Sequence, residues 1–268
     1  MSESSWGTDT DLWPTIPPPF LPVGEDLDLV RRACPPGLLE ETAKPRILVL
    51  GVTPALVGAP WPAASEVHAV DFDQAMIDIL WVPQDGRQCH CERWQEMPFP
   101  DGYFDLVIGD CSFNALPRIA EYGAVLKEIG RVRRPSAPLV CRFFVQPEPR
   151  LTLKGLAGEE GRRFAHYAPY SRQLLISIGG ALPDGSLHLA DLPDRIRTEF
   201  GDVDEFLTAL GQTPDSRERA WKTFEFDLDL NYPNRRQIAE IFGAYFEKVE
   251  FIEPGYDCGE FCLTVHCR

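Results

Sequence analysis

The stretch ILVLGVTPAL, residues 47–56, begins as an unbroken apolar run and reaches a glycine at position 51. Such a run is typical of a central strand in a parallel sheet, which is buried on both faces. Gly51 stands where the strand should end, and a glycine there lets the backbone come close to a ligand. Nucleotide-binding loops usually carry two or three glycines, whereas Thr53 and Ala55 occupy the later positions here. The stretch alone therefore leaves a cofactor loop and an ordinary strand end as alternatives.

Strand and helix patterns alternate along the chain on either side of this stretch. Apolar runs predict strands over residues 46–51, 65–73, 87–92, 104–110 and 138–144. Apolar residues at helical spacing predict helices over 24–34, 73–81 and 119–134. The links between these segments are short, which indicates a parallel sheet covered by helices on both faces.

The alternation lapses after residue 146. From about 146 to 230 the patterns are helical and carry no strand signal, which predicts a helical cap inserted between strands five and six. An amphipathic helix is then expected over 234–246, and strands over 248–253 and 260–267. The link between the last two strands is too short for a crossover helix, so they should pair antiparallel.

We therefore expect an α/β fold. Its centre is a doubly wound, mostly parallel seven-stranded sheet with one antiparallel C-terminal strand, and it carries a helical insertion. A chain of 268 residues is most simply a single domain, here 1–268, with residues 1–25 as an irregular N-terminal arm rich in Pro, Ser and Asp.

The composition of the chain indicates which classes of partner to expect and which cellular compartment. A formal net charge of −15 repels phosphate backbones and argues against nucleic acid. No apolar run reaches the length of a membrane span, and the N-terminus lacks the pattern of a signal peptide, so a cytoplasmic protein without a membrane partner is expected. The eight cysteines are interpreted as buried thiols. The clusters at 89–91 and 258–267 match no paired CxxC spacing, so no metal site is expected.

Polar or small residues follow four of the predicted strands. Gly51 follows the first, Asp71 the second, Glu92-Arg93-Trp94 the third and Asp110-Cys111 the fourth. Ligands of open α/β sheets bind at these carboxyl ends, and an acid twenty residues after the glycine can accept hydrogen bonds from ribose hydroxyls. Each residue alone is also explained by a turn, a cap or packing, whereas the combination favours an elongated nucleoside ligand.

In two longer stretches the sequence resembles the class I S-adenosylmethionine (SAM)-dependent methyltransferases. EMPFPDGYFDLVIGD (96–110) followed by VLKEIGRVRRPSAPLVCRFF (125–144) has the family's order of turn, strand, helix and strand, and AVDFDQAMID (69–78) matches its second strand and helix. The likeness covers residues 45–145, and 234–268 by pattern only. The glycine loop GVTPAL is a variant, because Val49 stands where the family usually has an acid.

The resemblance implies a Rossmann-like methyltransferase fold, SAM as the cofactor and a set of contacts to it. Asp71 would bind the ribose, Phe72 and Met76 the adenine region, and Asp110 and Cys111 would line the methionine arm and the methyl group. The full set of expected cofactor-binding residues is Gly51, Val52, Thr53, Asp71, Phe72, Met76, Arg93, Trp94, Asp110 and Cys111. Thr53 could also cap the following helix, with Pro54 at its first position.

No catalytic residue is assigned, because methyl transfer from a sulfonium depends mainly on positioning and a dry site. Polar aromatic residues in the predicted cap are the candidates for a base, although surface or core roles are favoured for each: His166, Tyr167, Tyr170 and His188. Trp221, Phe224 and Phe226 could line an apolar substrate slot, but ordinary core packing is favoured.

The expected function is methyl transfer (EC 2.1.1.-) to a small-molecule acceptor, which the sequence does not name. It names neither the acceptor atom nor the oligomeric state. A nicotinamide-dependent oxidoreductase would need the G-x-G-x-x-G loop that this chain lacks. The remaining alternative is a non-catalytic protein of methyltransferase fold that serves as a scaffold or partner subunit. Val49 and Thr53 favour this alternative, and Asp71 and the strand FDLVIGD oppose it.

Overall fold

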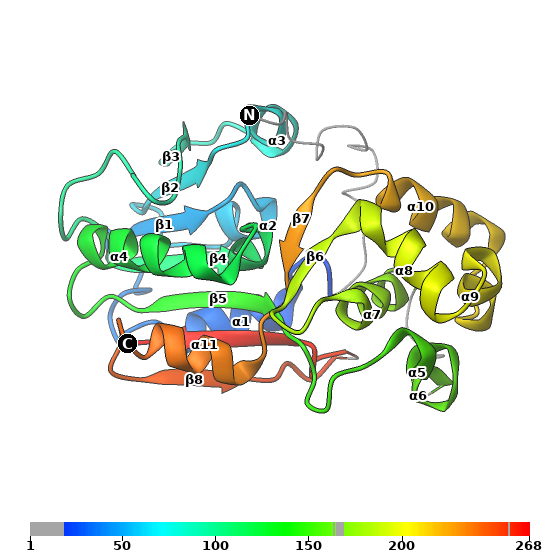
Figure 1. Ribbon diagram of the computed structural model, residues 1–268. Coiled ribbons are helices and arrows are strands. Elements are labelled where there is room, and N and C mark those ends of the chain that lie inside the picture. Colours follow the sequence, from blue (N-terminus) through cyan, green and yellow to red (C-terminus); the bar gives the residue numbers. More distant parts are fainter. Residues whose placement is uncertain (1–18, 163, 165–168, 257) are drawn as a thin grey trace.

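A central sheet of seven strands organises the protein, in the order β3-β2-β1-β4-β5-β9-β8 (Figure 1). The computed structural model describes residues 19–162, 164, 169–256 and 258–268. The strands are β1 (Arg46–Leu50), β2 (Glu66–Asp71), β3 (Arg87–Cys91), β4 (Leu106–Asp110), β5 (Leu139–Phe144), β8 (Val249–Ile252) and β9 (Cys262–Cys267).

Strands β1 to β5 pair in parallel, and β9 runs antiparallel between β5 and β8. The predicted mostly parallel sheet with one antiparallel C-terminal strand is thereby confirmed. The predicted strands overshoot the observed ones by one to three residues. Their outer residues belong to turns or caps, as at Asp73, whose carboxylate accepts a hydrogen bond from the backbone of Ala75 and caps the next helix.

Helices cover both faces of the sheet, so it is doubly wound as predicted. One face packs on α1 (Gly24–Ala33), α2 (Pro54–Val57) and α3 (Gln74–Leu80), through alternate strand residues such as Ile47 and Val49. The other packs on α4 (Tyr122–Val132) and α11 (Arg235–Phe242), through Leu48 and Leu50. Figure 1 shows α4 and α11 in front of the strands.

Two predicted helices are corrected by the structure. The segment expected to be helical from 119 begins as a 3₁₀ turn (Ile119–Glu121), and α4 follows it and ends at Val132. The helix predicted to reach residue 246 ends at Phe242, because Gly243 caps it and its following residues form a turn.

Between β5 and α11 the chain forms a mainly helical group beyond the carboxyl end of β5 (Figure 1). Its helices are α5 (Leu153–Ala157), α6 (Glu159–Arg162), α7 (Pro169–Gly180), α8 (Leu192–Glu199), α9 (Val203–Ala209) and α10 (Pro214–Phe224), with a 3₁₀ turn at Leu189–Asp191. All of these helices except α6 contribute to one apolar core, which the sheet joins through Phe144 and Cys262.

This segment also contains β6 (Ser186–His188) and β7 (Asp229–Asn231), which pair antiparallel. The expectation of no strand here was wrong. Three-residue strands are too short to show a period, and their partners lie about forty residues apart. Of the predicted N-terminal arm, residues 1–18 lie outside the described residues, residues 19–23 form turns and bends, and α1 begins at Gly24. In the described part of the chain, no helix has the length and apolar character needed to span a membrane.

A buried amide network fastens β7 to the sheet. Asn231 is fully buried, and its side-chain amide donates hydrogen bonds to the carbonyls of Phe113 and Leu116 at 2.9 and 2.5 Å. Its side-chain oxygen accepts from the Tyr122 hydroxyl of α4. The amide of Asn114 bridges the carbonyls of Asn231 and Phe144, each at 2.8 Å. The helical group is therefore held to the ends of β4 and β5 by hydrogen bonds shielded from water.

We expect Asn231→Ala to lower the free energy of unfolding by about 3 kcal/mol, because it leaves the buried Tyr122 hydroxyl and the Leu116 carbonyl without the partners that Asn231 supplies and removes one of two donors to the Phe113 carbonyl. Urea denaturation measures the change. Lys127→Ala, on the exposed side of α4, is the matched control and should stay within about 0.5 kcal/mol of the wild type. Equal effects of the two substitutions would show that the network contributes little.

Two histidines pair on β2 and β3. A hydrogen bond of 3.1 Å joins Nδ1 of His68 to Nε2 of His90, and the rings of Phe99, Tyr103 and Phe104 pack edge-on against His68. Burial, with a smaller contribution from His90, lowers the pKa of His68 from 6.5 to about 4. His68 is therefore neutral at neutral pH.

As the pH falls from 6.5 to about 4, the unfolded chain binds a proton at His68 that the folded chain does not. Folding stability should fall across this window, by about 3 kcal/mol for this residue. Denaturation curves between pH 7.5 and 4 should show a shallower loss for His68→Phe than for the wild type. Gln88→Ala, at an exposed residue of β3 that does not titrate, should follow the wild type. A His68→Phe curve parallel to the wild type would contradict the assignment.

Candidate functional site

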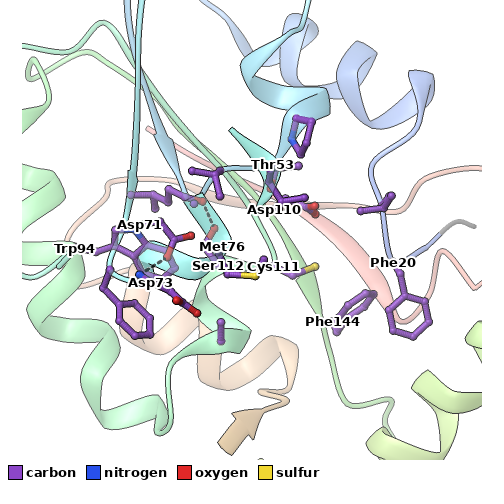
Figure 2. A pocket seen from close by; sticks show the side chains of 18 residues that line it. Phe20, Thr53, Asp71, Asp73, Met76, Trp94, Asp110, Cys111, Ser112 and Phe144 are labelled. Carbon is purple, nitrogen blue, oxygen red and sulfur yellow. Dashed lines mark hydrogen bonds between the residues drawn. The ribbon is translucent and has the colours of Figure 1, made fainter. Parts of the chain in front are cut away.

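A pocket of about 250 Å³ lies at the carboxyl ends of β1, β2 and β4 (Figure 2). Nine of the ten expected cofactor-binding residues line it: Gly51, Val52, Thr53, Asp71, Phe72, Met76, Trp94, Asp110 and Cys111. Arg93 does not, because its side chain is exposed beside Trp94. Carboxyl ends of adjacent parallel strands meet at one edge of a sheet, which is why residues up to 60 positions apart converge.

The loop after β1 depends on the conformation of Gly51. Its φ is +96°, a region that side chains with a Cβ rarely adopt, and its N–H donates to the carbonyl of Val70 at 2.8 Å. Pro54 takes the first position of α2, as expected. Thr53 precedes that helix, but its side chain makes no capping hydrogen bond, so the expected capping role is not observed. Its side chain borders the pocket instead.

Gly51→Ala should cost about 1–2 kcal/mol of folding stability, because alanine is strained at this φ. The matched control is Gly130→Ala within α4, where no atom lies within 4 Å of an added Cβ. That change should stabilise the protein by about 0.5–1 kcal/mol, since alanine favours helices over glycine. Urea denaturation tests both, and shifts of the same sign would contradict the assigned role of Gly51.

Asp71 is the acid at the end of β2. Its Oδ1 accepts a hydrogen bond from the backbone N–H of Asp73 at 3.0 Å, and the added Cβ of an alanine at Gly51 would lie 3.8 Å from its Oδ2. Burial raises the pKa of Asp71 from 3.8 to about 6, against the lowering effect of backbone N–H donors. At neutral pH the group is a partly desolvated carboxylate that faces the pocket, able to accept hydrogen bonds.

Apolar side chains form the walls next to Asp71. Phe72 is 52% exposed at the opening, while Met76 and Trp94 are buried. The Trp94 indole N–H donates to the carbonyl of Val70 at 2.6 Å, which fixes its ring between the core and the pocket. This end offers one exposed aromatic ring and two buried apolar side chains to a ligand.

A buried ion cluster lies behind the other end of the pocket. Nε of Arg142 on β5 donates to Oδ1 of Asp110 at 2.7 Å, and its Nη1 donates to Asp26 of α1 at 3.3 Å. The side chains of all three are at most 7% exposed. Burial raises the pKa of Asp110, and the Arg142 guanidinium opposes that rise. The Asp110 carboxylate is thus paired with an internal cation.

The sequence interpretation missed Arg142. It also missed Phe20 and Leu21, two N-terminal residues that line the pocket. A signal for Arg142 exists, because an arginine inside the strand LVCRFF requires a buried acid as its partner. For Phe20 the only hint is an apolar pair within a proline-rich segment.

Cys111 follows Asp110 with a left-handed φ of 52° and borders the pocket. Burial raises the pKa of its thiol well above the usual range, which keeps it protonated. The neighbouring Ser112 hydroxyl donates to the carbonyl of Leu50 at 2.7 Å, so its proton already bonds the last residue of β1 (Figure 2).

Of the candidate bases of the sequence interpretation, the two that lie within the described residues, Tyr170 and His188, do not line the pocket. His166 and Tyr167 lie outside the described residues. His188 pairs with Asp229 at 2.8 Å on β6 and β7, away from the lining residues. Tyr170 accepts a hydrogen bond from Arg219 at 2.7 Å. Phe224 is buried in the core of the helical group, against which Trp221 and Phe226 pack, as favoured from the sequence.

Comparison with known proteins agrees with this architecture. Residues 50–141, about a third of the chain, match the family model described as "Methyltransferase domain". The CcbJ methyltransferase from Streptomyces caelestis superimposes with a TM-score of 0.54 at 14% identity, over 100% of this chain and 99% of that one. The chain has a Rossmann-like methyltransferase fold.

A solved structure whose name describes another activity also shares this fold. A Rhodobacter sphaeroides protein named as a zinc-dependent alcohol dehydrogenase gives a TM-score of 0.57 at 15% identity, over 97% of this chain and 94% of that one. At such identities the likeness concerns the fold alone. No curated protein matches the sequence. The family match and the fold together support a methyltransferase.

Proposed function

We propose that this protein is a SAM-dependent methyltransferase (EC 2.1.1.-) that acts on a small-molecule acceptor in the cytoplasm. The observation that carries the proposal is the pairing of Gly51 and Asp71. A glycine with positive φ ends β1, and a desolvated carboxylate ends β2 beside it on the same pocket. This is the arrangement that binds a ribose at the switch point of an α/β sheet.

SAM would lie along the part of the pocket between Asp71 and Cys111. Asp71 would accept hydrogen bonds from the ribose hydroxyls, Phe72 and Met76 would contact the adenine, and Gly51 would let the loop backbone approach the ligand. Since Arg142 holds the Asp110 carboxylate, we assign Asp110 and Cys111 to the wall along the methionine arm. Arg93, whose side chain is exposed, would contribute at most a contact at the rim.

SAM when bound would supply an electrophilic methyl group on a cationic sulfonium. The protein's part is to hold the reacting groups in line and to exclude water. Its lining suits a cation, because the charged side chains that border the pocket are Asp71, Asp73 and Asp110. Buried apolar residues around them keep the site dry.

The decisive experiment is calorimetric titration with SAM and with S-adenosylhomocysteine. We expect micromolar dissociation constants for the wild type and a loss of about tenfold or more for Asp71→Asn, because a carboxylate accepts stronger hydrogen bonds than an amide. Asp85→Asn removes the same charge from an exposed turn and should bind like the wild type. A folded protein that binds neither compound would instead support the non-catalytic scaffold alternative.

The pH dependence of binding provides an independent check. Because the pKa of Asp71 is raised to about 6, the carboxylate is lost as the pH falls below that value. The affinity for S-adenosylhomocysteine should be level above about pH 7 and should fall by up to about tenfold per pH unit below 6. Titrations from pH 8 to 5 test this, and Asp71→Asn should abolish the slope. An unchanged slope in that variant would assign it to another group.

A further inference from the structure

We infer that the end of the pocket opposite Asp71 is an acceptor subsite for a neutral aromatic small molecule, recognised by Phe20 and Phe144, with the ring of Tyr170 packed against Phe20 from outside the lining. This inference rests on the proposed function, because it assigns the remaining part of the pocket to SAM's reaction partner. Figure 2 shows Phe20 and Phe144 side by side at this end, with Asp71 and Trp94 at the other end and Cys111 between them.

The three rings come from remote parts of the chain and meet as an aromatic group. The rings of Phe20 and Phe144 lie 5.6 Å apart at an interplanar angle of 60°, and those of Phe20 and Tyr170 lie 6.0 Å apart at 71°. Tilted and edge-on pairs of this kind present flat faces and positive ring edges to a neighbour. A planar aromatic acceptor extends that packing, whereas a saturated ring of similar size gains only apolar burial.

Hydrogen bonds hold the backbone of both lining residues in place. Nη2 of Arg142 donates to the carbonyl of Phe20 at 3.4 Å. The backbone N–H of Phe144 donates to Oδ1 of Asn114 at 3.0 Å, and its carbonyl accepts from Nδ2 of Asn114 at 2.8 Å. The Tyr170 hydroxyl, behind Phe20, accepts from Arg219. A backbone that is already ordered loses less freedom when a ligand binds, which favours selection by shape.

The charges around the subsite select a neutral acceptor. Asp110 lies at this end, with Asp71 and Asp73 further along the pocket. The nearby cation, Arg142, is already paired with the carboxylates of Asp110 and Asp26. An anionic acceptor would meet a negative field, because the charged side chains among the described lining residues are all acids. Aromatic acids are therefore disfavoured relative to the same ring without the acid.

The test is a ligand-observed NMR titration of three probe molecules with protein that is saturated with S-adenosylhomocysteine. The probes are indole, indole-3-acetate and cyclohexylmethanol. We expect indole to bind at least about fivefold more tightly than either of the others. Phe20→Leu should weaken indole by about fivefold and leave the affinity for S-adenosylhomocysteine within about twofold of the wild type.

The matched control is Phe200→Leu, which changes an aromatic residue packed against the core of the helical group. This variant should bind indole like the wild type. If the melting temperature shows that Phe20→Leu does not fold, Phe144→Leu at the other lining ring takes its place with the same expected loss. Indole binding that is unchanged in the folded variant, absent altogether, or weaker than that of indole-3-acetate overturns the aromatic subsite. Failure of the wild type to bind S-adenosylhomocysteine instead overturns the proposed function, and the subsite with it.

Discussion

The guanidinium of Arg142 is the point on which the pocket depends. It lies inside the sheet and bonds a carboxylate from α1, a carboxylate from the end of β4 and the backbone of the N-terminal segment. The Tyr256 hydroxyl, from the loop before β9, also contacts it at 3.3 Å. A buried cation is tolerated only with such partners, and loss of one partner of a buried pair costs about 3–5 kcal/mol. Three regions that are remote in sequence, residues 20–26, the end of β4 and the loop before β9, are therefore fixed around one side chain, and the pocket wall is fixed with them.

The variant glycine loop GVTPAL suits the local backbone and packing at the end of β1. The chain needs one residue with positive φ to leave β1 and pass Asp71, and Gly51 supplies it. The position of the missing acid, Val49, is fully buried among apolar side chains between the sheet and α1–α3. A carboxylate there would have to be desolvated without a partner in that cluster, so valine suits the local packing.

Much of the fold could be predicted from the sequence because parallel strands buried on both faces leave continuous apolar runs. The rule that ligands bind at carboxyl strand ends then predicts that Asp71 and Asp110 lie at one site, and both line the same pocket. What the sequence does not show is non-local. The hydrogen-bond partners of Asn231, the pairing of β6 with β7 and the return of Phe20 to the pocket each join residues with no periodic relation. The sequence also does not show which of two adjacent residues after β3 faces the pocket, and in the structure Trp94 does while the side chain of Arg93 is exposed.

The position of β9 has a consequence for synthesis of the chain. It fills the place between β5 and β8, yet it leaves the ribosome about 120 residues after β5. At usual rates of translation the backbone edge of β5 waits on the order of ten seconds for its partner. During that interval the edge is a template for pairing with other strands. A nascent chain of this topology should therefore need shielding until its last strand emerges, and Arg142 can gain its contact with Tyr256 only at that stage.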